Sequence, residues 1–128
     1  MARNDPMGGG KPLEITVSSP SEQVEVVHPK GEVDMHSSPQ LREVLKSATD
    51  KSIEGIVLDL SDVDHMDSSG VAVLIEGLRW SRAKGISYEL AALSDAVRVV
   101  IELAKLDSVF SISPTISAAI EGLKKKKT

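Results

Sequence analysis

Four consecutive residues, Asp67-Ser68-Ser69-Gly70, combine two hydroxyls with an acidic neighbour and a glycine. Aspartate and serine side chains accept hydrogen bonds from the unpaired amides in a helix's first turn. Those amides and the positive end of the helix dipole also favour an anion such as phosphate. The tetrapeptide alone fits simple helix capping, but its position makes a phosphorylatable serine chemically plausible.

A short apolar segment and an amphipathic segment flank this tetrapeptide. Residues 56–60 are mostly β-branched or leucine, as in a buried central strand. From Val71 to Leu78, apolar residues recur every three or four positions, and Gly85 is a natural helix stop. We expect a strand over 56–60, an acidic turn over 62–66 and a helix over about 68–84.

A serine hydrolase is an alternative, because His65 is close to Ser68 in sequence and Gly70 follows the serine by two positions. The strained turn of such a nucleophile also needs glycine two residues before the serine, where Met66 stands. No acidic partner for a catalytic triad is identifiable. We therefore expect no catalytic residue here.

A magnesium site is a second alternative, because acidic residues are frequent around the turn. Their spacing lacks the pattern of a calcium-binding loop, and the chain has no glycine loop that would cradle phosphates. We expect neither a metal ion nor a cofactor. The acidic residues are Asp59, Asp62, Asp64 and Asp67.

Alternating patterns along the chain predict the order β-β-α-β-α-β-α-β-α. This order indicates a single α/β domain with a mixed sheet of about five strands flanked by about four helices. The predicted strands are 13–17, 23–28 with a break or bulge at 29–31, 56–60, 87–91 and 109–112. The predicted helices begin at Ser37 or Ser38, near Ser68, at Ser94 or Asp95 and at Pro114.

The two ends of the chain differ in composition from the middle. Residues 1–12 are rich in proline and glycine and are predicted to form a disordered tail. The predicted domain covers residues 13–123, and residues 124–128 form a basic C-terminal tail.

Two loops should lie at the functional edge of this sheet, because sites in parallel sheets gather at the carboxyl ends of strands. They are residues 34–38, which begin with Asp34, and residues 62–69, which contain Ser68. From the residues alone, Asp34 fits a solvated turn acid.

Overall composition excludes several classes of function. The formal net charge of −4 and the presence of only one Trp, one Tyr and one Phe argue against nucleic-acid binding. The chain has no cysteine, so it forms no disulfide. No apolar run has the length of a membrane span, so we expect a cytoplasmic protein without membrane insertion.

Four segments give the chain a resemblance to a known family. From about Leu13 to Leu123, it resembles the STAS domains, and most closely the free-standing bacterial anti-sigma-factor antagonists. The order and spacing of the segments make the match specific. They are Gly31-Glu32-Val33-Asp34, the run 56–61, Met66-Asp67-Ser68-Ser69-Gly70 and the run 103–110.

The resemblance implies a switch in partner binding at Ser68. In the antagonists, an anti-sigma-factor serine kinase phosphorylates the serine that matches Ser68, and a serine phosphatase restores it. The unmodified form binds the kinase and frees the sigma factor. By the same resemblance, Asp34, Asp67, Ser68, Ser69 and Gly70 contribute to partner binding.

A phosphate at Ser68 would add a charge of about −1.5 to −2 among Asp34, Asp64 and Asp67, opposing an acidic partner surface. The alternative within the family is a cytoplasmic STAS subunit that docks on the permease of a lipid or anion transporter. In that class, the residue at Ser68 serves docking rather than phosphorylation.

Overall fold

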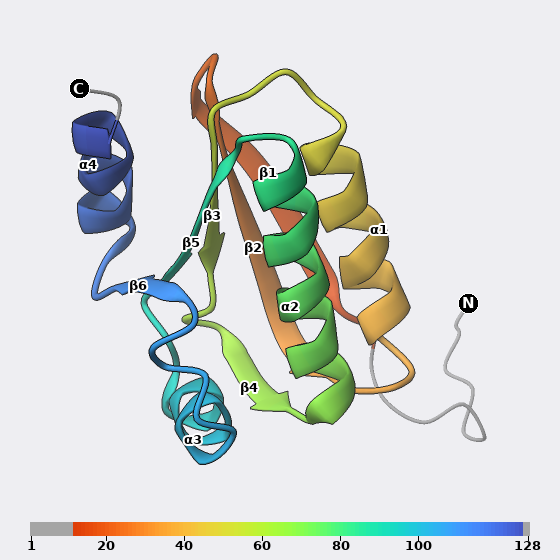
Figure 1. Ribbon diagram of the computed structural model, residues 1–128. Coiled ribbons are helices and arrows are strands. Elements are labelled where there is room, and N and C mark those ends of the chain that lie inside the picture. Colours follow the sequence, from red (N-terminus) through yellow and green to blue (C-terminus); the bar gives the residue numbers. More distant parts are fainter. Residues whose placement is uncertain (1–11, 127–128) are drawn as a thin grey trace.

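The computed structural model describes residues 12–126, which form a layered α/β domain (Figure 1). Helices α1 and α2 cover one face of the sheet, α4 covers part of the other, and α3 lies beside β4. The strands are β1 (Glu14–Ser21), β2 (Val24–Val33), β3 (Gly55–Asp59), β4 (Val63–Met66), β5 (Ser87–Ala91) and β6 (Ser111–Ser113). The helices are α1 (Ser38–Thr49), α2 (Ser68–Ala83), α3 (Asp95–Leu103) and α4 (Ile116–Lys126).

The sheet is mixed, as the sequence predicts. Strand β1 runs antiparallel to β2, and the remaining pairs are parallel, in the order β1-β2-β3-β5-β6. Every residue of β3 is buried, so the predicted central strand is confirmed. The parallel arrangement places the carboxyl ends of β2, β3 and β5 at one edge of the sheet.

Strand β4 corrects the prediction of an acidic turn over 62–66. It pairs in parallel with the end of β2, through Gly31 with Val63 and Val33 with Met66. Gly31 has a φ of +122°, and the register shifts between Gly31 and Glu32. This bulge turns the end of β2 away from β3, so that its last residues are free to pair with β4.

Other boundaries differ less from the predictions. Strand β1 continues past the predicted end at residue 17 to Ser21, because Ser18 pairs with Val26 and Ser21 with Val24, with a register shift between them. Strand β2 runs to Val33, so of the two predicted alternatives at 29–31, a break or a bulge, the structure has a bulge, which follows Gly31. The last strand begins at Ser111 rather than Val109, because the Val109 amide donates to the carbonyl oxygen of Leu106 in a turn.

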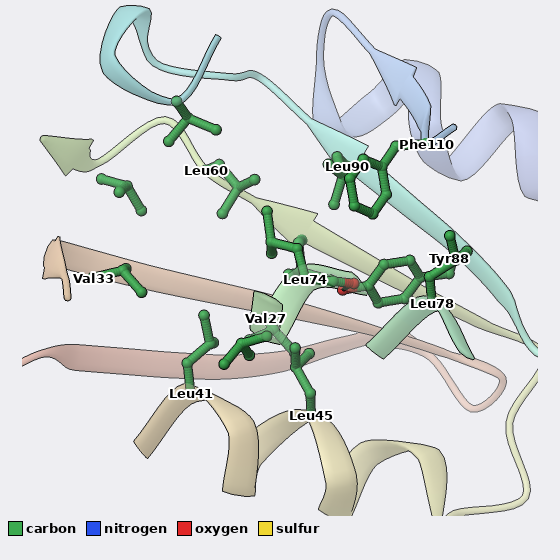
Figure 2. Close-up of a cluster of buried hydrophobic side chains, with 14 of the residues drawn as sticks. Val27, Val33, Leu41, Leu45, Leu60, Leu74, Leu78, Tyr88, Leu90 and Phe110 are labelled. Carbon is green, nitrogen blue, oxygen red and sulfur yellow. Dashed lines mark hydrogen bonds between the residues drawn. The ribbon is translucent and has the colours of Figure 1, made fainter. Parts of the chain in front are cut away.

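The main core lies between the sheet and helices α1 and α2 (Figure 2). Leu41 and Leu45 of α1, Val27 of β2 and Leu74 of α2 meet there and are fully buried. A second core on the opposite face packs α4 against the sheet through Ala119, Leu123 and three sheet residues. Burial of the apolar side chains in the main core is the main force that fixes α2 on the sheet. It thereby also fixes the start of α2, which follows β4.

Parts of the predicted tails lie outside the described residues. These are residues 1–11 of the N-terminal tail and residues 127–128 of the basic tail. Helix α4 continues to Lys126, so the basic run begins within this helix. Every helix within residues 12–126 is too short or too polar to cross a lipid bilayer.

Candidate functional site

The candidate site is centred on the junction between β4 and α2. Strand β4 ends at Met66, Asp67 is the N-cap, and Ser68 is the first residue of the helix. One carboxylate oxygen of Asp67, Oδ1, accepts hydrogen bonds from the Ser69 amide at 2.8 Å and the Gly70 amide at 3.3 Å. The predicted capped helix start is present, and Asp67 is the residue that caps it.

Replacing Asp67 by Ala is expected to destabilise the fold by about 1 kcal/mol, because two amides of the first turn lose their acceptor. Urea unfolding followed by circular dichroism measures the change. Ser69→Ala is the matched control, because the Ser69 hydroxyl makes no hydrogen bond among the described residues. Equal losses in the two variants would contradict the assignment of the cap to Asp67.

The Ser68 side chain is left free by this arrangement. Ser68 is exposed, and its hydroxyl makes no hydrogen bond within residues 12–126. Ser69 is half-buried and contributes its amide to the Asp67 cap. The site therefore offers one accessible hydroxyl at a helix N-terminus, where the dipole favours an added anion.

Gly70 permits a close approach between α2 and the strands behind it. A Cβ atom at this position would lie 2.6 Å from Met66 Cγ and 2.8 Å from Val33 Cγ1, both on buried side chains. The absence of a side chain thus allows the first turn of α2 to pack directly on β2 and β4. The role of this glycine within the domain is close packing.

Asp34 lies at the same edge of the sheet as Ser68. Its neighbour Val33 pairs with Met66, and the Asp67 amide donates to the Val33 carbonyl oxygen at 3.1 Å. The two loops that the sequence places at the carboxyl edge are therefore brought together by the β2–β4 pair. Figure 1 shows the loop after β2 and the start of α2 at this end of the sheet.

The Asp34 carboxylate is held in place by its own loop. Its Oδ1 accepts hydrogen bonds from the amides of His36 at 2.9 Å and Ser37 at 3.0 Å. The bond from the Ser37 amide is the main reason that the pKa of Asp34 is lowered from its ordinary value. The other oxygen, Oδ2, makes no hydrogen bond among the described residues and is available to a partner.

Ser37 has a role in this loop that the sequence reasoning missed. Ser37 is the N-cap residue of α1, at the helix start that the sequence predicts, but its side chain makes no capping bond to α1. Instead, its hydroxyl donates to the Glu32 carbonyl oxygen at 2.7 Å and accepts from the Asp34 amide at 3.0 Å. The Asp-x-x-Ser spacing is the signal that could have indicated this turn.

The lowered pKa of Asp34 predicts a pH-dependent contribution to stability. A carboxylate whose pKa is lower in the folded state stabilises the fold above its unfolded pKa of about 3.9, and this contribution disappears as the pH falls through the folded value. Asp34→Asn should therefore be less stable than the unaltered protein at pH 7, and the difference should shrink as the pH falls below the unfolded pKa.

Urea unfolding at pH 7, 5, 3 and 2 measures this difference. Asp64→Asn removes an exposed carboxylate that makes no hydrogen bond among the described residues, and so controls for the loss of a charge alone. A difference between Asp34→Asn and the unaltered protein that does not shrink toward low pH would contradict the assignment.

Several other candidate residues lie apart from Ser68. Asp59 is buried and accepts hydrogen bonds from the Ser61 amide and hydroxyl. Asp62 Oδ2 accepts a hydrogen bond from His28 Nε2 at 2.7 Å. His65 is exposed and makes no hydrogen bond to Ser68 among the described residues.

The chain is similar to a described family over the segment that contains both loops. A family model described as the STAS domain matches residues 18–119. An anti-sigma-B factor antagonist of Listeria monocytogenes is 33% identical over 84 residues, which cover 64% of this chain and 72% of that protein. The anti-sigma-B factor antagonist of Bacillus subtilis is 28% identical over 91 residues, which cover 71% of this chain and 83% of that protein.

The structure is also similar to solved structures. A crystal structure of an anti-sigma factor antagonist from Mycobacterium paratuberculosis matches with a TM-score of 0.80 and 28% identity, covering 88% of this chain and 94% of that one.

Proposed function

The chain belongs to the STAS domain family, and from this premise we propose that it is an anti-sigma factor antagonist switched by phosphorylation of Ser68. The observation that carries the proposal is the exposed Ser68 hydroxyl, which is free of internal hydrogen bonds at the first residue of α2. The named relatives, which are anti-sigma-B factor antagonists, support the choice of partner class.

The modification is a phosphoryl transfer from ATP. The Ser68 oxygen attacks the γ-phosphorus of ATP, and the bond between that phosphorus and the β–γ bridging oxygen breaks. ADP leaves, and the hydroxyl proton of Ser68 passes to a base on the kinase. This chain contributes only the acceptor hydroxyl, so the catalytic groups belong to the partner. A serine that needs no rearrangement to reach solvent suits such a substrate role.

Phosphorylation at Ser68 should preserve the fold. The phosphate lies at the N-terminus of α2, where the helix dipole favours negative charge, and Ser68 has no internal hydrogen bond to lose. The new charge is exposed and adds to the carboxylates of Asp34, Asp64 and Asp67, of which Asp64 is exposed and the other two are half-buried. The modification therefore changes what the surface can bind rather than how the chain folds.

In the resulting cycle, the unmodified protein binds an anti-sigma factor that is also a serine kinase. The complex releases the sigma factor, phosphorylation ends the complex, and a serine phosphatase regenerates the binding form. Asp34 presents its unpaired Oδ2 beside this contact, which supports a role in recognition.

The test is calorimetric titration of the unmodified protein into the anti-sigma factor kinase encoded nearest to its gene. We expect a complex with micromolar or tighter affinity and release of bound sigma factor. Binding to a transporter permease from the same genome, with none to the kinase, would instead establish the transporter-docking alternative.

A further inference from the structure

Met35 is the exposed apolar residue that follows Asp34 in the loop after β2. Its side chain is 69% exposed, although methionine is among the residues most often buried. Isolated exposed apolar residues are common on protein surfaces, so exposure alone does not indicate a function. The position and rigidity of Met35 distinguish it from a scattered surface residue.

The loop that carries Met35 is ordered by hydrogen bonds on both sides of this residue. Asp34 Oδ1 accepts from the amides of His36 and Ser37, and the Ser38 amide donates to the Asp34 carbonyl oxygen at 2.7 Å. The Ser37 hydroxyl ties the same turn to the Glu32 carbonyl oxygen. These bonds order the backbone on both sides of Met35, whose side chain is exposed.

Met35 also lies within reach of a partner that covers Ser68. The Val33 carbonyl oxygen and the Asp67 amide are 3.1 Å apart, and the chain path from this bond limits the Cα separation of Met35 and Ser68 to less than about 18 Å. A standard interface of about 800 Å² per partner has a radius of roughly 16 Å. A protein bound over Ser68 at this edge can therefore also contact the Met35 loop.

We propose that Met35 is an apolar anchor for the protein kinase that binds at Ser68, and that it inserts into an apolar pocket beside the kinase's nucleotide site. The proposal rests on the function proposed above and adds a residue that selects the partner. Interface energy is concentrated in a few well-buried side chains, and methionine is enriched at interfaces. Its unbranched, polarizable side chain adapts to a pocket of irregular shape.

The charged residues at the site cannot supply this anchor. Asp34, Asp64 and Asp67 form no ion pair among residues 12–126. Asp64 is exposed, whereas Asp34 and Asp67 are half-buried and already accept hydrogen bonds from backbone amides. Exposed charges contribute little net affinity, whereas burial of a methionine contributes in proportion to the apolar area removed from water. The acidic residues thus orient the encounter, and Met35 holds the complex together.

The test compares Met35→Gln, which keeps the length of the side chain and removes its apolar character, with Met35→Leu. Both are titrated calorimetrically against the anti-sigma factor kinase encoded nearest to the gene. We expect Met35→Gln to weaken binding at least tenfold and Met35→Leu to stay within about threefold of the unaltered protein. Circular dichroism and urea unfolding verify that both variants fold.

Val17→Thr is the matched control, because Val17 is another exposed apolar residue, in the middle of edge strand β1. It should bind like the unaltered protein. Met35→Gln binding within twofold of a tightly binding unaltered protein overturns the anchor and leaves the proposed function intact. Absence of binding by the unaltered protein overturns both.

Discussion

Gly70→Ala is expected to unfold at a clearly lower urea concentration than the unaltered protein, with a loss of about 1–3 kcal/mol in the free energy of unfolding. The added Cβ would lie 2.6 Å from Met66 Cγ and 2.8 Å from Val33 Cγ1. Val33 is β-branched and fully buried, so the clash cannot be relieved by rotating the end of a flexible side chain. The start of α2 must shift instead.

The same substitution at Gly122 in α4 is the matched control. A Cβ atom there meets nothing within 4 Å, and Ala is favoured over Gly in a helix by about 1 kcal/mol. Gly122→Ala should therefore be at least as stable as the unaltered protein. If the two variants had equal stability, the close packing of α2 against β2 and β4 would be refuted.

Ser68→Asp is expected to lower the affinity for the anti-sigma factor kinase at least tenfold, which corresponds to about 1.4 kcal/mol. The carboxylate adds one charge at the exposed helix start, where the partner must approach closely, and it removes the hydroxyl that the partner reads. The enzymatically phosphorylated protein should lose more affinity than Ser68→Asp, because phosphate is larger than the aspartate carboxylate and carries a charge of about −1.5 to −2. Calorimetric titration measures both changes.

Two controls separate the switch from a folding defect. Ser68→Asp should retain or slightly raise stability, because aspartate is favourable in the first turn of a helix. Ser68→Ala should fold and bind but should accept no phosphate. Affinity that stays unchanged in both Ser68→Asp and the phosphorylated protein would contradict the switch.

Helices and strands with a clear pattern of apolar residues could be predicted from the sequence. Strand β3 and one face of helix α2 are each buried through a continuous set of apolar residues. Such burial needs consecutive apolar residues in the strand and apolar residues every three or four positions in the helix, and both patterns are visible in the sequence. Strand β4 could not be recognised in the same way. It has four residues, and only Val63 and Met66 are buried, so its pairing depends on the bulge in a strand about 30 residues earlier.

The details of the site show the same division between local and non-local causes. The cap at α2 follows from local residue types, although the choice of Asp67 over the two serines depends on the backbone conformation of Asp67. The role of Ser37 could not be assigned, because its hydroxyl bonds to Glu32 in the preceding strand rather than to the helix that follows. The close packing at Gly70 depends on Val33, which lies far away in sequence.

The central claim is that Ser68 is a phosphorylated residue of an anti-sigma factor antagonist. Its most direct test is intact-mass analysis of the protein purified from its own cells, with fragmentation to locate the modified residue. The account predicts a population with one added phosphate, at Ser68, that disappears after phosphatase treatment and in the Ser68→Ala variant. Phosphate at another residue, or none under any growth condition in which the kinase is present, would contradict it.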